Sequence, residues 1–214
     1  MAGLGLGPPD FALFEIGDPE HRAAALEQTL QPKLLDVGRQ CLSGLERVAG
    51  KALHAHPGRL ARRRGGAPRE ILVAFSESEK GYRGLPYLAI VMSARHLHAR
   101  IGVRGESQRR ADMRRALERE AQNLARKGKP FRKLRQYADW NHEDLPELAP
   151  AHSPAFWLEL GADLAPGRPG LDVGVAFARE EARSLALGDL LGVFRDLSPL
   201  YKVLANAPEG SAPA

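Results

Sequence analysis

The sequence predicts an α+β protein in which helices cover one face of an antiparallel sheet. Three apolar runs, 71–76, 86–93 and 96–105, follow one another with only short connections, as the strands of an antiparallel meander do. Helical patterns gather before and after these runs instead of alternating with single strands, and this order is typical of α+β proteins. We therefore expect a three-strand meander plus one or two further strands.

The two ends of the chain are predicted to lie outside this fold. Residues 1–10 and 206–214 are rich in glycine, proline or alanine, and we expect both to be disordered tails. Residues 11–205 are expected to form a single domain, because a chain of 214 residues with 43% hydrophobic content can bury one sizeable core.

The composition favours a cytoplasmic protein that does not contact a membrane. The first residues lack the basic and apolar regions of a signal peptide, and no run reaches the ~20 apolar residues of a membrane span. The single cysteine, Cys41, excludes an intrachain disulfide and fits a reducing compartment.

Two helices are predicted before the meander. Residues 11–16 form a short apolar segment, interpreted either as an edge strand or as a lead-in packed on the core. Asp18 followed by Pro19 is a helix-start signal. Pro32 is expected to interrupt this first helix, and apolar residues at intervals of three or four predict a second helix that ends at Gly50.

Two further candidate strands follow the meander. Residues 51–70 are basic and show little periodicity, which predicts a surface connection. Residues 131–140 are interpreted as a candidate fourth strand. Residues 171–178 alternate well enough to predict a fifth strand, in which Gly174 marks a bulge or a close approach of two backbones.

Three helices are predicted after the meander. The first runs from about 107 to 126 and is expected to pack across the three strands. Ser153 begins a short second helix, and the last one, from about 187 to 204, is expected to be broken or bent at Pro199. The apolar positions expected to bury the first of these helices are Leu117, Ala121 and Leu124.

Charge is strongly segregated along the chain, although the net charge is only +5. Residues 1–50 hold four Lys and Arg against seven Asp and Glu (−3), residues 51–135 hold 22 against seven (+15), and residues 136–214 hold five against 12 (−7). A block this basic favours an anionic partner. A solvated arginine-rich surface is the alternative interpretation.

Three classes of function follow from this charge pattern. A binding module for nucleic acid or another polyanion is the first, and an enzyme acting on a phosphorylated or otherwise anionic small molecule is the second. A structural or protein-interaction role is the third. No catalytic residue is identified, so whether the chain is an enzyme stays open.

Several short motifs, in order along the chain, resemble a known family. They are Pro32-Lys33-Leu34, the segment HPGRLARR at 56–63, Val73-Ala74-Phe75 followed by KGYRGLP at 80–86, and SPLYK at 198–202. Together they resemble the YktB-like proteins of bacteria, domain of unknown function 1054. The resemblance implies an α+β fold with an antiparallel sheet and implies no activity. Leu60 and Tyr87 stand where the family motifs have histidines.

Three segments are expected to converge at one edge of the sheet as an anion-binding cleft: residues 54–64, the tip 80–83, and the pair 201–202. Guanidinium and ammonium groups suit phosphate oxygens, and a tyrosine ring supplies a stacking face. The expected lining residues are His56, Arg62, Arg63, Lys80, Tyr82, Arg83, Tyr201 and Lys202.

No metal or cofactor is expected. His54 and His56, and likewise His96 and His98, lie two residues apart, but neither pair has an acidic companion of the kind a metal site needs. The glycines near Lys80 lack P-loop spacing.

Overall fold

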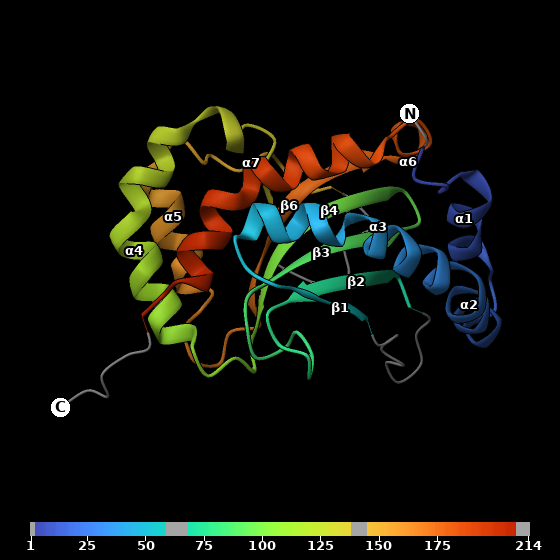
Figure 1. Cartoon of the computed structure of the whole chain (residues 1–214), viewed down its shortest axis with the longest axis horizontal. Coiled ribbons are helices and arrows are strands. Elements are labelled where there is room, and N and C mark those ends of the chain that lie inside the picture. The colour runs from blue at the N-terminus through green and yellow to red at the C-terminus, as the bar shows by residue number, and fades with distance from the viewer. Residues whose placement is uncertain (1–2, 59–67, 138–144, 209–214) are drawn as a thin grey trace.

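The computed structural model describes residues 3–58, 68–137 and 145–208 as an α+β fold around one open, antiparallel, six-stranded sheet (Figure 1). The strand order is β1-β2-β3-β4-β6-β5. The strands are β1 (His54–Pro57), β2 (Glu70–Ser76), β3 (Tyr87–Ser93), β4 (His96–Arg104), β5 (Arg135–Gln136) and β6 (Gly170–Ala178).

The predicted meander is confirmed. Strand β2 pairs antiparallel with β3, and β3 pairs antiparallel with β4. The register places His56, Ala74, Ala89, Arg100 and Gly174 in one row across five strands. These residues come from distant parts of the chain, so the sheet is what brings them together.

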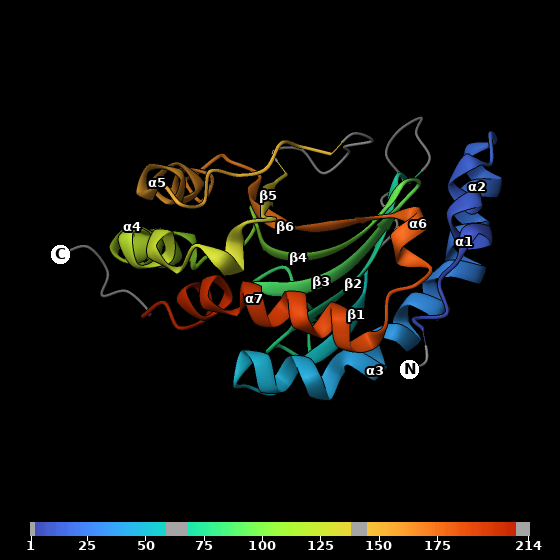
Figure 2. The same ribbon diagram turned by 90° about the horizontal axis from the view of Figure 1, so that it is seen from above.

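Helices cover one face of the sheet, as expected. Helices α3 and α7 lie on the same side of it, and the apolar side chains of alternate strand positions pack against them (Figure 2). The helices are α1 (Pro8–Ala12), α2 (Pro19–Ala25), α3 (Gln31–Ala49), α4 (Arg110–Lys127), α5 (Pro154–Ala162), α6 (Arg179–Ala182) and α7 (Leu187–Ala205). Short 3₁₀ turns span Leu13–Glu15 and Lys129–Phe131, and a π-helical turn spans Leu26–Leu30.

The expected interruption at Pro32 is absent, because a π-helical turn precedes it. Asp18 caps α2 by accepting a hydrogen bond from the His21 N–H at 2.7 Å, as its position predicts. The Gln31 N–H donates to the Leu26 carbonyl, one residue further back than in an α-helix. Pro32 therefore falls in the first turn of α3, directly after the π-helical turn, and the helical path continues through it.

The N-terminal segment is packed, which corrects the expected disorder of residues 3–10. Leu4 and Leu6 are buried, and the Leu4 N–H donates to the Leu185 carbonyl at 3.1 Å. Asp10 is buried and forms a 2.6 Å ion pair with Lys33. The following 11–16 segment is a helical lead-in packed on the core.

Helix α4 differs from its predicted placement. Its Leu117, Ala121 and Leu124 side chains are buried, as expected. However, α4 packs mainly against α5 and α7 at the end of the sheet, and it does not cross the three strands of the meander (Figure 2).

Three smaller differences concern the remaining elements. The connection before the meander contains the edge strand β1, which the sequence pattern did not reveal. Of the fourth strand expected at 131–140, the described part forms only the two residues of β5, and residues 138–140 lie outside the described residues. Helix α7 continues through Pro199 and is not broken there. Within the described residues, no helix has both the length and the apolar character that crossing a membrane requires.

Candidate functional site

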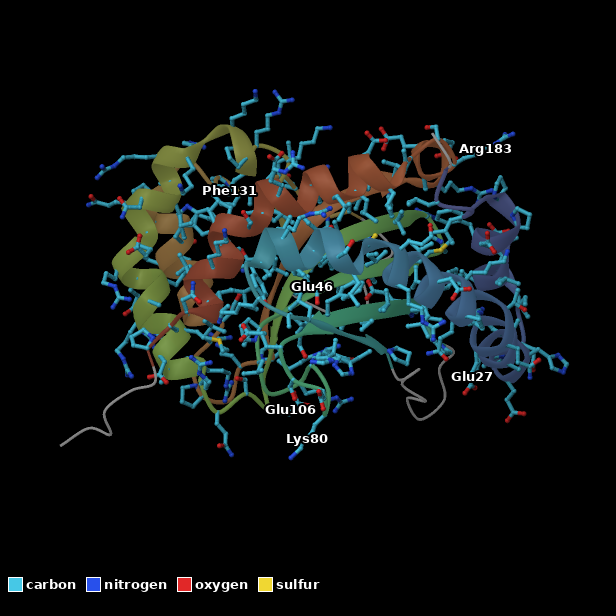
Figure 3. All side chains as sticks on the ribbon, viewed as in Figure 1. Glu27, Glu46, Lys80, Glu106, Phe131 and Arg183 are labelled. Atoms are coloured by element: carbon cyan, nitrogen blue, oxygen red, sulfur yellow. The ribbon has the colours of Figure 1, made fainter. Side chains whose placement is uncertain are left out.

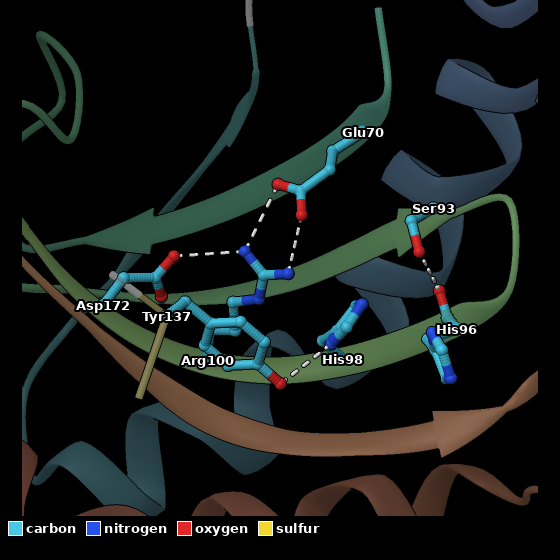
Figure 4. Close-up of polar contacts among 7 residues, drawn as sticks. All are labelled: Glu70, Ser93, His96, His98, Arg100, Tyr137 and Asp172. Carbon is cyan, nitrogen blue, oxygen red and sulfur yellow. Dashed lines mark hydrogen bonds and ion pairs between the residues drawn. The ribbon is translucent and has the colours of Figure 1, made fainter. Parts of the chain in front are cut away.

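The face of the sheet opposite α3 and α7 carries polar and aromatic side chains. Successive strand residues point to opposite faces, so the apolar core positions alternate with a second set. Among the described residues, this second set includes Glu70, Ser93, His98, Arg100 and Asp172 (Figure 4). Most of these side chains are buried, so the second face is a polar interior and not a solvated surface.

Arg100 lies at the centre of this face. Its guanidinium donates to Glu70 through Nη2–Oε1 at 2.7 Å and Nη1–Oε2 at 3.2 Å. The same Nη1 donates to Asp172 Oδ2 at 3.1 Å, and the guanidinium carbon lies 4.0 Å from the centre of the Tyr137 ring (Figure 4). Because a buried charge is costly unless it is paired, two carboxylates and an aromatic face keep Arg100 inside the fold.

The charges of this group depend on one another. Burial disfavours the charged form of Arg100, but the nearby Asp172 and Glu70 carboxylates outweigh burial and raise the pKa of the guanidinium. For Asp172 burial is the larger effect, and it raises the pKa of the carboxyl to about 7 despite the attraction of Arg100. Because Asp172 shares one guanidinium with a second carboxyl, its protonated and ionised forms are both populated near neutral pH.

His98 and Tyr137 extend the polar network. The Tyr137 hydroxyl and His98 Nδ1 are hydrogen-bonded at 3.0 Å. Burial lowers the pKa of His98 well below its usual range, with Arg100 adding to the effect, so His98 is neutral. Burial also raises the pKa of Tyr137 to about 12, which keeps the hydroxyl protonated.

Two glycines of the sheet, Gly102 and Gly174, leave space for the side chains of Tyr87 and Arg100. A Cβ at Gly102 would overlap the Tyr87 ring, and a Cβ at Gly174 would come within 2.9 Å of Arg100 Cα and Cγ. Tyr87, Gly102 and Asp172 are register neighbours on β3, β4 and β6, so the Tyr87 ring lies over β4 and is directed toward Asp172. The predicted close approach at Gly174 is confirmed.

An open cleft of about 620 Å³ lies where β2 leads into β3. His56, Lys80, Tyr82 and Arg83 line it. His56 Nε2 is hydrogen-bonded to the Ser78 carbonyl at 2.8 Å, which anchors strand β1 to the connection. Lys80 projects outward from the connection, on the same edge of the molecule as Glu106 (Figure 3).

The cleft contacts the polar face through aromatic rings. The Tyr82 and Tyr87 rings meet edge to face, with their centres 4.9 Å apart. The guanidinium carbon of Arg104 lies 5.8 Å from the centre of the Tyr82 ring and 5.9 Å from that of Tyr87. Tyr87 is fully buried, and burial raises the pKa of its hydroxyl well above the usual range. These rings separate the exposed cations of the cleft from the buried Arg100 network.

The eight residues expected to form one cleft are only partly brought together. His56, Lys80, Tyr82 and Arg83 share the cleft. Tyr201 is buried in the core on α7, and Lys202 lines a separate groove between α3 and α7. The pair 201–202 therefore does not belong to the cleft, whereas Arg62 and Arg63 lie outside the described residues.

The histidine pairs do not form a metal site in the part of the chain that the structure describes, where no three potential ligands come together. The centres of the His96 and His98 rings lie 5.7 Å apart on one face of β4, with the ring planes tilted by 57°. His98 is engaged by Tyr137, and His54 lies 4.0 Å from Glu79.

Sequence reasoning missed the Arg100 network. A signal was present, because Asp172 is the one charged residue of an otherwise apolar strand and Arg100 lies in the middle of a strand, each two positions from a glycine of the same strand. A charge inside a central strand needs a buried partner. The partner itself could not be found, because Glu70, Arg100 and Asp172 are joined only by strand pairing.

The fold and this site define an α+β protein with a six-stranded antiparallel sheet, helices on one face and a buried polar network on the other. Residues 8–153 match the model of a family described as a domain of unknown function, DUF1054. The chain therefore belongs to this family, as the resemblance of its motifs predicted. The match ends before the stretch at 198–202 that also resembles the family.

Two relatives illustrate the extent of the similarity. The UPF0637 protein of Staphylococcus aureus strain N315 is 30% identical over 112 residues, which cover 52% of this chain and 55% of that protein. The UPF0637 protein of Staphylococcus haemolyticus strain JCSC1435 is 30% identical over 105 residues, 49% of this chain and 52% of that protein. The chain thus spans about half the length of the curated relatives it matches, and neither name states an activity.

Proposed function

We propose that the chain binds a compact anionic ligand in the cleft between β1 and the β2–β3 connection. The observation that carries this proposal is the convergence of Lys80 and Arg83 on one hollow with His56 and Tyr82. Lys80 and Arg83 are exposed, Arg83 pairs with Glu106 at 3.1 Å, and the imidazole and phenol add polar groups beside them. Ammonium and guanidinium donors bind phosphate and carboxylate oxygens through charge-assisted hydrogen bonds.

The size and setting of the cleft favour a phosphorylated or otherwise anionic small molecule. A hollow of about 620 Å³ falls within the usual range of small-ligand sites. Arginines of α4 are partly neutralised within their own helix, where Arg114 pairs with Glu118 at 2.8 Å and Arg115 pairs with Asp112. These ion pairs reduce the positive charge that α4 offers to a polyanion.

Nucleic acid or another polyanion is the second candidate ligand. It is favoured by the +15 charge of residues 51–135, from 22 Lys and Arg against seven Asp and Glu. Arg62 and Arg63 belong to this candidate on sequence grounds alone. A structural or protein-interaction role and the cytoplasmic location both stay predictions.

The test compares two variants that lose the same charge. Removing the cleft cations (Lys80→Gln with Arg83→Gln) should weaken binding of the phosphorylated ligand by about 1–3 kcal/mol, the usual worth of hydrogen bonds to charged groups. The matched control, Arg119→Gln with Arg132→Gln, removes two exposed charges outside the cleft and should bind normally. Calorimetric titration with a panel of small phosphate esters measures both.

A salt titration separates the two candidate ligands. Binding of a short oligonucleotide through many phosphates should weaken by orders of magnitude between about 50 and 200 mM salt, whereas a compact anion should respond less. If the cleft variant and the control variant lose the same amount of binding affinity, the cleft is not the binding site. A steep salt dependence with oligonucleotide alone would favour the polyanion.

A further inference from the structure

A groove of about 370 Å³ lies between α3 and α7. Figures 1 and 2 show these two helices side by side. Three basic side chains line the groove, Arg47 from α3 and Arg195 and Lys202 from α7, and all three are exposed. The groove shares no described lining residue with the cleft, so it is a separate surface.

The groove residues of α7 follow the helix repeat. They are spaced by four, three and four positions, namely Leu191, Arg195, Ser198 and Lys202. Residues at such spacing lie on one stripe of a helix. The eleven steps of this stripe span roughly 16 Å, and the seven steps from Arg195 to Lys202 span roughly 10 Å. The two cations therefore border the groove from the same side of α7.

The groove also offers apolar surface. Val48 and Leu191 are partly buried and pack at the edge of the core. A Cβ at Gly44 would overlap the Leu191 side chain, so this glycine allows α7 to lie close to α3. The groove thus combines apolar contact area with basic groups along its margin.

The three cations have no acidic partner in the part of the chain that the structure describes. No acid is among the described lining residues, and none of the three forms an ion pair there, whereas Arg39 of α3 pairs with Asp36 at 3.0 Å. Arg47 and Lys202 lie in the last turns of their helices, where a cation also offsets the helix dipole. Arg195 lies in the middle of α7, so the dipole does not account for it.

We propose that this groove docks an acidic, amphipathic segment of a partner protein. Carboxylates of the segment pair with Arg195 and Lys202, and its apolar side chains cover Leu191. In a helical segment, two carboxylates seven residues apart repeat at the same two-turn spacing as these cations. An amphipathic helix laid into a groove is a common mode of peptide recognition.

Nucleic acid and an anionic membrane match the groove less well. Either would extend beyond the stripe of roughly 16 Å and meet acids on other faces of the same helix, where Asp189 and Asp196 are exposed. Residues 136–214, which include α7, hold five Lys and Arg against 12 Asp and Glu. A phosphate backbone also has no apolar group to place against Val48 and Leu191. The charge complementarity is local, and this favours a short peptide segment.

The experiment uses the full chain and a synthetic peptide of about 12 residues, roughly three helical turns. The peptide is built from Glu, Leu and Ala, with two Glu seven residues apart beside a stripe of Leu. One control peptide has Gln in place of Glu, and the other has Ala in place of Leu. Fluorescence anisotropy at low salt should show binding of the acidic peptide and weaker binding of both controls, because each control lacks one of the two complementary features. Added salt should weaken the binding.

Two charge-matched double variants locate the site. Arg195→Gln with Lys202→Gln should weaken binding of the acidic peptide by about tenfold, the combined worth of two exposed ion pairs. Arg119→Gln with Arg132→Gln removes two exposed charges outside the groove and should bind the peptide as the unmodified chain does.

Three results would overturn the proposal: unchanged peptide binding in the Arg195 and Lys202 variant, equal losses in both double variants, or equal binding of the acidic peptide and its controls. If that variant loses binding of an oligonucleotide or of anionic phospholipid vesicles but keeps that of the peptide, the groove belongs to that polyanion and the proposal fails.

Nuclear magnetic resonance on the unmodified chain decides the question if the Arg195 and Lys202 variant fails to fold. The peptide should shift the amide resonances of residues 44–48 and 191–202, and unshifted resonances there reject the site. The cleft is tested through Lys80 and Arg83, which lie outside the groove, so the two proposals can fail separately.

Discussion

At the scale of single residues, Asp172 is a buried carboxyl group with a strongly raised pKa. It is 2% exposed and shares the Arg100 guanidinium with Glu70. Two carboxyls compete for one cation in a region from which water is removed, so burial favours the protonated form of Asp172. The polar network therefore holds a proton that a solvated aspartate would release.

This proton predicts a pH dependence of stability. In the unfolded chain Asp172 ionises near pH 3.9, whereas in the folded chain its pKa is about 7. Between these values the folded state binds more protons, so the contribution of Asp172 to the free energy of unfolding is largest below about pH 4 and is lost as pH rises toward 7.

Asp172→Asn tests this prediction because the amide does not titrate. On going from pH 5 to pH 7.5, the native chain should lose about 1–3 kcal/mol of stability relative to the variant, given at most about 1.4 kcal/mol per pH unit. Urea unfolding of both chains at the two pH values measures this difference. The lowered pKa of His98 acts in the opposite direction, but His98 is present in both chains and largely cancels. Parallel stability–pH curves would contradict the raised pKa.

At the scale of elements, β4 has two different faces. Leu97, Ala99 and Ile101 face the helices and are fully buried, while His98 and Arg100 face the polar side. The neighbouring strand β6 approaches closely because Gly174 lies opposite Arg100. The pairing of β4 with β6 thus depends on the absence of a side chain at one position.

Gly174→Ala should lower the free energy of unfolding, because the new Cβ would overlap the Ala99 carbonyl oxygen and crowd Arg100. Overpacking of this kind costs about 1–3 kcal/mol. The control is Gly192→Ala in α7, where a Cβ meets nothing within 4 Å and should stabilise the helix by up to about 1 kcal/mol. Thermal and urea unfolding of the two variants give changes of opposite sign if this account holds, and equal changes would refute it.

At the scale of the whole molecule, the first residues join distant parts of the fold. Gly3 pairs with Ala186, just before α7, and Asp10 pairs with Lys33 on α3. Leu4 and Leu6 are 8% and 3% exposed and belong to the main core cluster. The N-terminal segment therefore contributes to the core, although its glycines and prolines resemble a tail.

Leu6→Ala should destabilise the chain by about 2–5 kcal/mol, the usual cost of removing a buried leucine side chain. Leu158→Ala is the matched control, because Leu158 is 48% exposed and its truncation should cost little. Chemical unfolding measured on both variants distinguishes them. If the Leu6 variant were as stable as the Leu158 variant, residues 3–10 would not contribute to the core, and the expected N-terminal tail would be supported.

The sequence by itself determined the features that depend on neighbouring residues. Apolar runs at 71–76 and 86–93 and the alternating pattern at 96–105 were enough to predict the meander, and the cap at Asp18 and the end at Gly50 followed from local backbone preferences. The tip 80–83 and His56 were predicted as site residues because their types and order are visible in the chain.

The contacts between side chains that are distant in sequence could be found only in the tertiary structure. Strand pairing joined Glu70, Arg100 and Asp172, whereas the packing of α7 on the core buried Tyr201 away from the cleft. Edge strand β1 forms because β2 offers it hydrogen bonds, since its own residues have little strand pattern. Side-chain periodicity reports which face a residue occupies, but only the register between strands determines which side chains share that face.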